Sequence, residues 1–237
     1  MKICGLQKTT LIDYPGHVGC TIFTAGCNFR CPWCYSKELV LPELIAKQQE
    51  ISEQGILEFL KEKQGLLEGA VLCGGEPTLH PDLPEFCKKI KDLGFLIKLD
   101  TNGSNPKMLK DLIDQKLIDY VAMDIKLPKQ RYAALFANGG ITADDIEGSI
   151  KILKNSPVDF EFRTTCAPGV HTADDLAQMA EWIGEKVPGR KPKYFLQNFR
   201  PERTIDPKFE SLRPLPPEFF SEALELIKPF VPDCRAR

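Results

Sequence analysis

Three cysteines in one short run could hold a metal cluster. Cys27, Cys31 and Cys34 follow the spacing C-x3-C-x2-C, so one tight loop supplies three thiolates. In a four-iron iron–sulfur cubane, each iron needs one ligand beyond its sulfides. Three protein ligands therefore leave one iron open to a substrate or cosubstrate. This vacancy favours chemistry at the cluster over electron transfer alone.

A structural zinc site is the alternative, because the run from Cys31 to Cys34 is by itself a C-x2-C pair. Structural zinc takes four ligands, usually from two such pairs. The sequence has no second C-x2-C pair and no H-x3-H pair. Cys20 or His17 would have to complete the set from an awkward position near a predicted strand. The pattern favours the cluster and leaves zinc open.

Composition excludes several classes of protein. The formal net charge is −2, so no basic field is available to bind nucleic acid through its phosphates. No apolar stretch approaches the length of a membrane span, and the N-terminus does not resemble a signal peptide. The six other cysteines are dispersed, and we expect them to be small buried hydrophobic residues in a reducing cytoplasm. They are Cys4, Cys20, Cys73, Cys87, Cys166 and Cys234.

Short β-branched runs alternate with amphipathic stretches along the chain, which predicts an α/β fold with a parallel sheet. We expect one domain over residues 1–237, with a core of about 15–200 and a last helix at about 216–231. The predicted strands are 18–25, 70–73, 95–99, 120–125, 160–165 and 194–199. The predicted helices are 51–63, 83–93, 106–116, 143–154, 172–184 and 218–230.

Unusual polar residues gather where these strands end, and parallel strands bind ligands at that edge. Alone, each group has an ordinary explanation as a turn or an ion pair. Together they predict one binding rim. The groups are the cysteine loop, Gly74-Gly75-Glu76-Pro77, Asp100-Thr101-Asn102-Gly103, Asp124 with Lys126, and Arg163. The aromatic residues Trp33 and Tyr35 flank Cys34, where a flat base could lie.

With these motifs together, the chain resembles the radical S-adenosylmethionine (SAM) enzymes. The cysteine spacing with an aromatic residue before the third cysteine carries the resemblance, which extends from residue 4 to about residue 201. Residues 5–16 are similar to the anaerobic ribonucleoside-triphosphate reductase activating proteins. Residues 100–103, 124–126 and 163–169 resemble pyruvate formate-lyase activating enzyme.

The resemblance implies a partial (β/α)6 barrel of the TIM type and a role for each motif. Cys27, Cys31 and Cys34 would hold a 4Fe–4S cluster whose open iron binds SAM. Gly74, Gly75 and Glu76 would bind the amino group of SAM, and Trp33 and Tyr35 would lie beside its adenine. The turn with Asn102 would lie beside the sugar. Asp124, Lys126 and Arg163 would lie near the methionine end. A monovalent cation would lie at Asp100, Thr101, the backbone of Ala122 and Asp124. Arg200 stands where the formate-lyase activases have a histidine, and it would take over the contact of that histidine with SAM.

The implied activity is one-electron cleavage of SAM to a 5′-deoxyadenosyl radical, which takes hydrogen from a glycine of a partner enzyme. That partner would be a glycyl-radical enzyme, with the anaerobic ribonucleotide reductase favoured, and the electron donor a flavodoxin or ferredoxin. No separate catalytic acid or base is expected. One alternative is a radical SAM reaction on another small molecule or peptide. An alternative of a different class is a non-enzymatic zinc-binding interaction protein.

Overall fold

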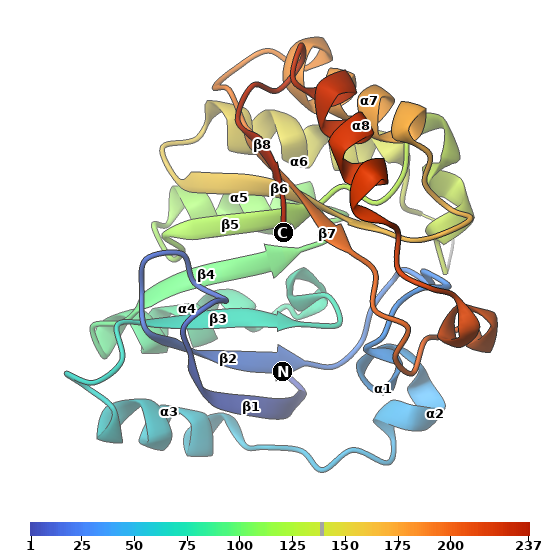
Figure 1. Ribbon diagram of the computed structural model, residues 1–237. Helices are drawn as coiled ribbons and strands as arrows, with labels where there is room; N and C mark the ends of the chain where they lie inside the picture. The colour runs from blue at the N-terminus through green and yellow to red at the C-terminus, as the bar shows by residue number, and fades with distance from the viewer. Residues whose placement is uncertain (138–139) are drawn as a thin grey trace.

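The structure is a computed structural model that describes residues 1–137 and 140–237. Within this part of the chain, one eight-stranded sheet runs in sequence order from β1 to β8 (Figure 1). Only β1 and β2 pair antiparallel, and every later pair is parallel. The strands are β1 (Ile3–Thr10), β2 (Gly19–Thr24), β3 (Gly69–Gly74), β4 (Leu96–Thr101), β5 (Tyr120–Asp124), β6 (Asp159–Cys166), β7 (Lys193–Asn198) and β8 (Cys234–Ala236).

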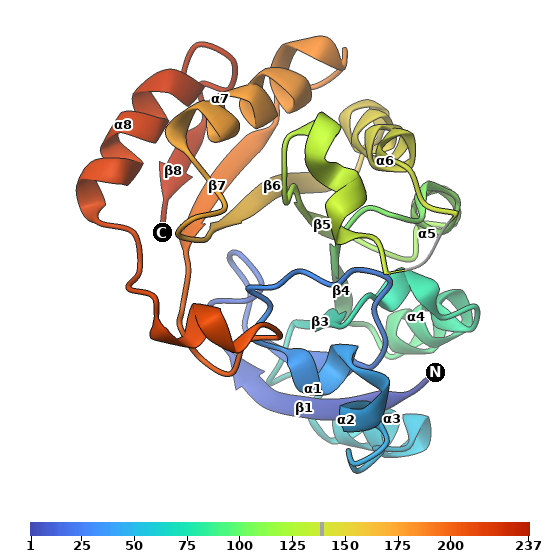
Figure 2. The ribbon, with the colours of Figure 1, turned by 90° about the vertical axis from the view of Figure 1, so that its right-hand side faces the viewer.

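Strands β2 to β7 are the six predicted strands, so the expected α/β fold with a partial barrel is confirmed. The strands follow an arc with the helices outside it (Figure 2). The helices are α1 (Lys37–Val40), α2 (Pro42–Ile45), α3 (Glu53–Glu62), α4 (Leu83–Asp92), α5 (Pro106–Asp114), α6 (Ala143–Asn155), α7 (Ala173–Glu181) and α8 (Pro217–Ile227). Short 3-10 turns occupy Pro77–Leu79, Lys129–Leu135 and Pro207–Ser211.

Sequence analysis did not find the two outer strands. Gln7, Lys8 and Thr9 in the second half of β1 are polar and exposed, so this strand lacks the alternation that marks a half-buried strand. The last strand, β8, is only three residues long and is mostly exposed. Both depend on pairing with β2 or β7, which a local pattern does not reveal.

The helix predicted over 172–184 is only partly right. Thr172 caps α7 as expected, since its hydroxyl accepts a hydrogen bond from the Asp175 N–H at 3.1 Å. After Glu181 the chain widens into a π-helical turn over Trp182–Lys186. There the buried Lys154 ammonium donates to three carbonyl groups, those of Ile183 at 2.7 Å, Gly184 at 2.8 Å and Val187. The Lys154 side chain, from α6, therefore provides hydrogen-bond donors for carbonyl groups at the end of this helix.

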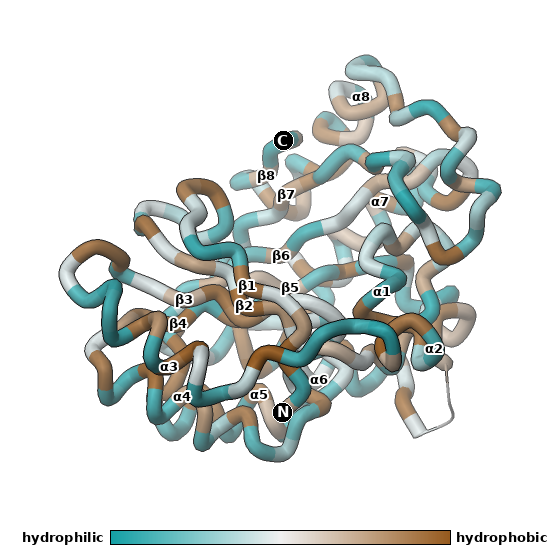
Figure 3. Tube along the Cα trace, turned by 90° about the horizontal axis from the view of Figure 1, so that it is seen from below, coloured by the Kyte–Doolittle hydropathy of each residue, from teal (hydrophilic) through white to brown (hydrophobic). Residues whose placement is uncertain are grey.

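Alternation along the strands separates the core from the barrel interior. On β4, Ile97 and Leu99 are buried in the main apolar core, whereas Lys98 and Asp100 line a cavity on the other face. Apolar stretches recur along the strands and helices, with hydrophilic segments between them (Figure 3). No helix in the described residues is long and apolar enough to cross a membrane. The sheet thus places charged side chains inside the arc.

Candidate functional site

The cysteine loop lies at the carboxyl rim, directly after β2. Cys27, Cys31 and Cys34 all line a cavity of about 400 Å³, a size typical of ligand pockets. Segments far away in the sequence fix the loop. The Arg30 N–H donates to the Leu135 carbonyl at 2.8 Å. The Asp206 N–H donates to the Pro32 carbonyl at 2.9 Å.

The thiol environment fits an anionic cluster. Cys27 Sγ accepts hydrogen bonds from the Phe29 N–H at 3.4 Å and from the Asn102 amide at 3.8 Å. Burial raises the pKa of Cys31 to about 12, while the Lys126 ammonium opposes that rise. In the described part of the chain, no three His, Cys, Asp or Glu side chains converge on one metal-ion position. A cubane binds each thiolate at a different iron, so the three thiols match it better than a single zinc ion.

The two glycines of the Gly74-Gly75-Glu76 segment are required by contact with the cysteine loop. A Cβ on Gly75 would lie 2.0 Å from the Gly26 carbonyl oxygen. A Cβ on Gly74, where φ is +117°, would lie 2.3 Å from the Thr24 carbonyl oxygen. Backbone hydrogen bonds seal the contact, from Gly75 to Thr24 at 2.8 Å and from Glu76 to Gly26 at 2.7 Å. The segment expected to bind the SAM amino group therefore packs its bare backbone against residues 24–26 of the chain. It also lines the cavity.

The Glu76 carboxylate is fully buried and already satisfied by protein donors. One oxygen accepts from the Thr78 N–H at 3.1 Å, the Thr78 hydroxyl at 2.5 Å and the Thr101 hydroxyl at 2.7 Å. The other accepts from the Asn102 N–H at 2.6 Å. Burial raises the pKa of Glu76, and these four hydrogen bonds oppose the rise. Glu76 thus joins the end of β3 to the end of β4.

The amide of Asn102 points toward the cysteine loop. It donates to Asn28 Oδ1 at 2.9 Å, and its oxygen accepts from the Ser104 N–H at 2.9 Å. Asn28 in turn donates to the Ser104 hydroxyl at 2.8 Å. The turn expected to meet a sugar therefore anchors the cluster loop through its side chains.

A series of ion pairs crosses the barrel interior. We call its five residues the charge ladder: Lys98, Asp100, Asp124, Lys126 and Arg163. Lys98 pairs with Asp100, and Arg163 reaches the other oxygen of Asp100 at 3.0 Å. Arg163 also donates to Asp124 at 3.0 Å, and Lys126 pairs with Asp124 at 3.2 Å. Burial alone would raise the pKa of Asp124, but Lys126 and Arg163 lower it to about 2. Parallel pairing of β4, β5 and β6 brings these side chains together.

The aromatic residues beside Cys34 differ in their surroundings. Trp33 is buried and packs edge-on against His171, with ring centroids 5.5 Å apart. Tyr35 is 54% exposed and lines both this cavity and a neighbouring one. His171 also donates from Nε2 to the Lys126 carbonyl at 2.8 Å, because its Nδ1 accepts from the Ala167 N–H at 3.0 Å. His171, which was not among the predicted site residues, therefore supports Trp33 and the backbone of Lys126.

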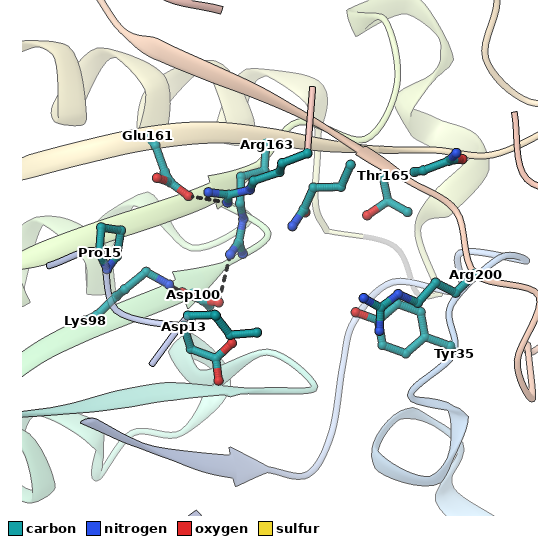
Figure 4. A pocket seen from close by; sticks show the side chains of 13 residues that line it. Asp13, Pro15, Tyr35, Lys98, Asp100, Glu161, Arg163, Thr165 and Arg200 are labelled. Atoms are coloured by element: carbon teal, nitrogen blue, oxygen red, sulfur yellow. Dashed lines mark hydrogen bonds and ion pairs between the residues drawn. The ribbon is translucent and has the colours of Figure 1, made fainter. Parts of the chain in front are cut away.

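The neighbouring cavity, which we call the side cavity, has a volume of about 350 Å³ (Figure 4). The β1–β2 loop supplies Ile12 and Asp13 on one side, and the end of β7 leads to Arg200 on the other. Arg200 and Tyr35 both line this cavity (Figure 4). Arg200 lines this side cavity and is absent from the lining of the cysteine cavity. The other predicted site residues, fourteen positions on five segments, line the cysteine cavity: Cys27, Cys31, Trp33, Cys34, Tyr35, Gly74, Gly75, Glu76, Asp100, Thr101, Asn102, Asp124, Lys126 and Arg163.

Sequence reasoning missed two kinds of site residue. Lys98 shares a strand face with Asp100, and this two-residue spacing was the signal that could have found it. Asp13 and Gln197 line both cavities, but no local pattern marks them. Asp13 accepts a hydrogen bond from the Thr21 hydroxyl at 2.7 Å, which holds the β1–β2 loop against the barrel interior.

Comparison with known proteins agrees with this fold and shows the family. The sequence model of the Radical SAM superfamily matches residues 21–183, and the chain belongs to this superfamily. Membership implies a 4Fe–4S cluster and SAM as cofactors, for which the three thiols and the cavity are suited.

Individual relatives differ in activity. A protein of Methanocaldococcus jannaschii, provisionally named a glycyl-radical enzyme activating enzyme, is 32% identical over 91% of this chain and 87% of its own length. A 7-carboxy-7-deazaguanine synthase of a Synechocystis species is 27% identical over 68% of each chain. These two relatives carry different names.

Solved structures are similar in fold. A domain of a pyruvate-formate lyase-activating enzyme from Bacteroides vulgatus has a TM-score of 0.55 at 16% identity, over 72% of this chain and 99% of that chain. The structure titled native anSMEcpe with bound AdoMet has a TM-score of 0.62 at 20% identity, over 87% of this chain and 57% of that chain. At such low identity, the likeness establishes the fold alone.

Proposed function

We propose that this protein activates a glycyl-radical enzyme, with the anaerobic ribonucleoside-triphosphate reductase as its partner. The observation that carries the proposal is the near full-length similarity to the Methanocaldococcus jannaschii protein named for that activity. When bound, the cluster would supply one electron that splits SAM into methionine and a 5′-deoxyadenosyl radical. Hydrogen transfer from a glycine Cα would then give 5′-deoxyadenosine and a glycyl radical. A flavodoxin or ferredoxin in the cytoplasm would supply the electron.

The residues of the chain would bind and orient the reactants. Cys27, Cys31 and Cys34 would hold the cluster, and the cavity they share with Trp33 and Tyr35 would receive SAM. The contribution of the protein is then positioning and exclusion of water, because the cofactors carry the bond cleavage.

The side cavity supports a peptide as the second substrate. It shares Tyr35, Asp100 and Arg163 with the cysteine cavity, so a group inserted from the side would reach the SAM position. Its mouth exposes Ile12, which is 86% accessible. Exposed apolar side chains beside a polar cavity are typical of a docking site for another protein. We therefore expect the glycine loop of the partner to enter between the β1–β2 loop and β7.

A small-molecule substrate is the second candidate. It is favoured by the charged lining of the side cavity, which includes Lys98, Glu161 and Arg200, and by the deazaguanine synthases among the relatives. Such a substrate would be held by charged groups, whereas a glycine loop would depend on the rim of the cavity.

The decisive experiment combines the anaerobically reconstituted protein, a reductant, SAM and purified anaerobic ribonucleotide reductase. We expect a glycyl doublet in the electron paramagnetic resonance spectrum of the reductase, with one 5′-deoxyadenosine formed per radical. A second reaction would omit the reductase and measure SAM cleavage alone. Cleavage without a doublet on this or any other glycyl-radical enzyme would refute the activase and favour a small-molecule substrate. Zinc in place of iron would support the interaction protein instead.

A further inference from the structure

We propose that the Lys98 ammonium replaces the monovalent metal cation expected at Asp100 and Asp124, so that the charge ladder binds the SAM carboxylate without such an ion. This inference concerns SAM binding alone and needs no partner enzyme.

The expected cation ligands are already occupied by cationic side chains of the protein. Lys98 takes Oδ1 of Asp100, and Arg163 takes Oδ2 at 3.0 Å. On Asp124, Arg163 takes Oδ1 at 3.0 Å and Lys126 takes Oδ2 at 3.2 Å. All four carboxylate oxygens are thus engaged. A metal ion at any of these oxygens would lie beside a cationic side chain and be repelled by it.

The other expected ligands also have partners within the protein. The Thr101 hydroxyl donates to Glu76 at 2.7 Å and accepts from the Gly103 N–H at 3.1 Å. Ala122 lies inside the sheet, paired with Asp100 on one side and with Glu161 on the other. The residues named for the cation are present, but their surroundings do not fit it.

The net charge of the ladder favours an anion. Its two carboxylates face three permanent cations, which leaves one positive charge in excess. One further carboxylate would neutralise the group, whereas a metal cation would double the excess. Opposite charges attract strongly at such partly buried sites because water screens them poorly. The ladder therefore has the charge of a carboxylate receptor.

Lys98 is placed to contact Asp100 and not the ligand itself. Its side chain is only 2% exposed and pairs with Asp100. Both residues line the side cavity (Figure 4). Lys98 does not line the cysteine cavity, although Asp100, Asp124, Lys126 and Arg163 do. We infer that Lys98 is a positioning residue. It holds Asp100, which leaves Arg163 and Lys126 directed toward the incoming carboxylate.

The test measures equilibrium binding of SAM to the reconstituted, unreduced protein by calorimetry. Sodium, potassium and choline chlorides would be compared at equal ionic strength. For the natural sequence we expect the same dissociation constant in all three salts, and no sodium-23 line broadening when SAM is added. In Lys98→Met, binding in choline should weaken about tenfold and recover in sodium or potassium, as the metal ion fills the place of the ammonium.

Two control variants keep the test decisive. Lys98→Arg keeps the positive charge and should stay independent of the salt cation. Lys110→Met removes an exposed lysine that pairs with Asp114, and it should bind as the natural sequence does. The inference is overturned if the natural sequence needs sodium or potassium for tight binding, or if Lys98→Met binds SAM normally in choline. Should Lys98→Met fail to fold, the salt series and the sodium-23 signal of the natural protein still decide. Neither result bears on whether a glycyl-radical enzyme is the partner.

Discussion

The Glu76 carboxylate accepts a hydrogen bond from the backbone N–H of Asn102 at 2.6 Å, which ties the end of β3 to the end of β4. The side chain of Asn102 then reaches Cys27 Sγ at 3.8 Å. A fully buried carboxylate, whose hydrogen-bond donors among the described residues are all uncharged, therefore supports the cluster loop through one intermediate residue.

Replacing Glu76 tests this connection. In Glu76→Gln the side-chain NH2 group must face at least one N–H or O–H donor, so we expect a loss of about 1–3 kcal/mol in the free energy of unfolding. The cluster should also be lost faster under a chelator. Denaturant unfolding and iron release would measure both effects. The exposed Glu62→Gln is the matched control. Equal stability of the two variants would contradict the structural role of Glu76.

Adding one methyl group at Gly75 should be harmful, because its Cβ would meet the Gly26 carbonyl oxygen at 2.0 Å. We expect Gly75→Ala to lower stability by at least about 2 kcal/mol, as strained backbone contacts do, and to reduce cluster incorporation. Gly148→Ala is the matched control. Gly148 lies in α6, and its Cβ would meet only Pro106 of α5, at an ordinary distance of 3.5 Å. That variant should be neutral or more stable by about 0.5–1 kcal/mol. Normal iron content and stability in Gly75→Ala would argue against the contact.

Removal of one cluster thiol should abolish SAM cleavage and leave the fold intact. Cys31→Ala would remove one of three cluster ligands, so we expect reconstituted iron to fall well below the roughly four atoms per chain of a full cubane. Circular dichroism would check the fold, and methionine release would check the activity. Cys4→Ala, in β1 and outside both cavities, should keep both iron and activity. Cleavage retained by Cys31→Ala would count against the assignment of the cluster ligands.

The buried His171 should make stability fall in mild acid. Burial lowers its pKa below 6.5, so the folded state stays neutral while the unfolded chain takes up a proton. The unfolded state then binds more protons below about pH 6.5, and stability declines by up to about 1.4 kcal/mol per pH unit for one such group. Replacement by glutamine should flatten this decline when unfolding is followed between about pH 5 and 7. His80, whose pKa burial also lowers, accounts for a remaining slope. An unchanged slope in His171→Gln would show that the ring is protonated in the folded protein.

A change at the mouth of the side cavity should affect radical transfer to the partner enzyme and not SAM cleavage. Ile12→Asp places a charge where an apolar side chain is 86% exposed, so it should slow radical transfer to the reductase about tenfold or more and leave SAM cleavage unchanged. Leu66→Asp, at an exposed leucine that lines neither cavity, is the control. Equal radical yields from both variants would place the docking surface elsewhere.

The sequence alone determined the chemistry and the framework of this protein. The spacing of Cys27, Cys31 and Cys34 sets three thiolates on one loop, and the alternation of apolar runs sets six parallel strands, because both patterns are local and have a fixed period. The strand-end motifs were therefore found, together with the rim on which they meet.

Only the tertiary structure decided what those residues touch. The occupation of Asp100 by Lys98 and Arg163, and of Glu76 by Thr101 and Asn102, depends on the register between strands that the sequence does not encode locally. The same holds for β1 and β8, whose residues become strands only through a partner strand. Hydrogen bonds and ion pairs act over a few ångströms in space, and spacing along the chain leaves that proximity undetermined.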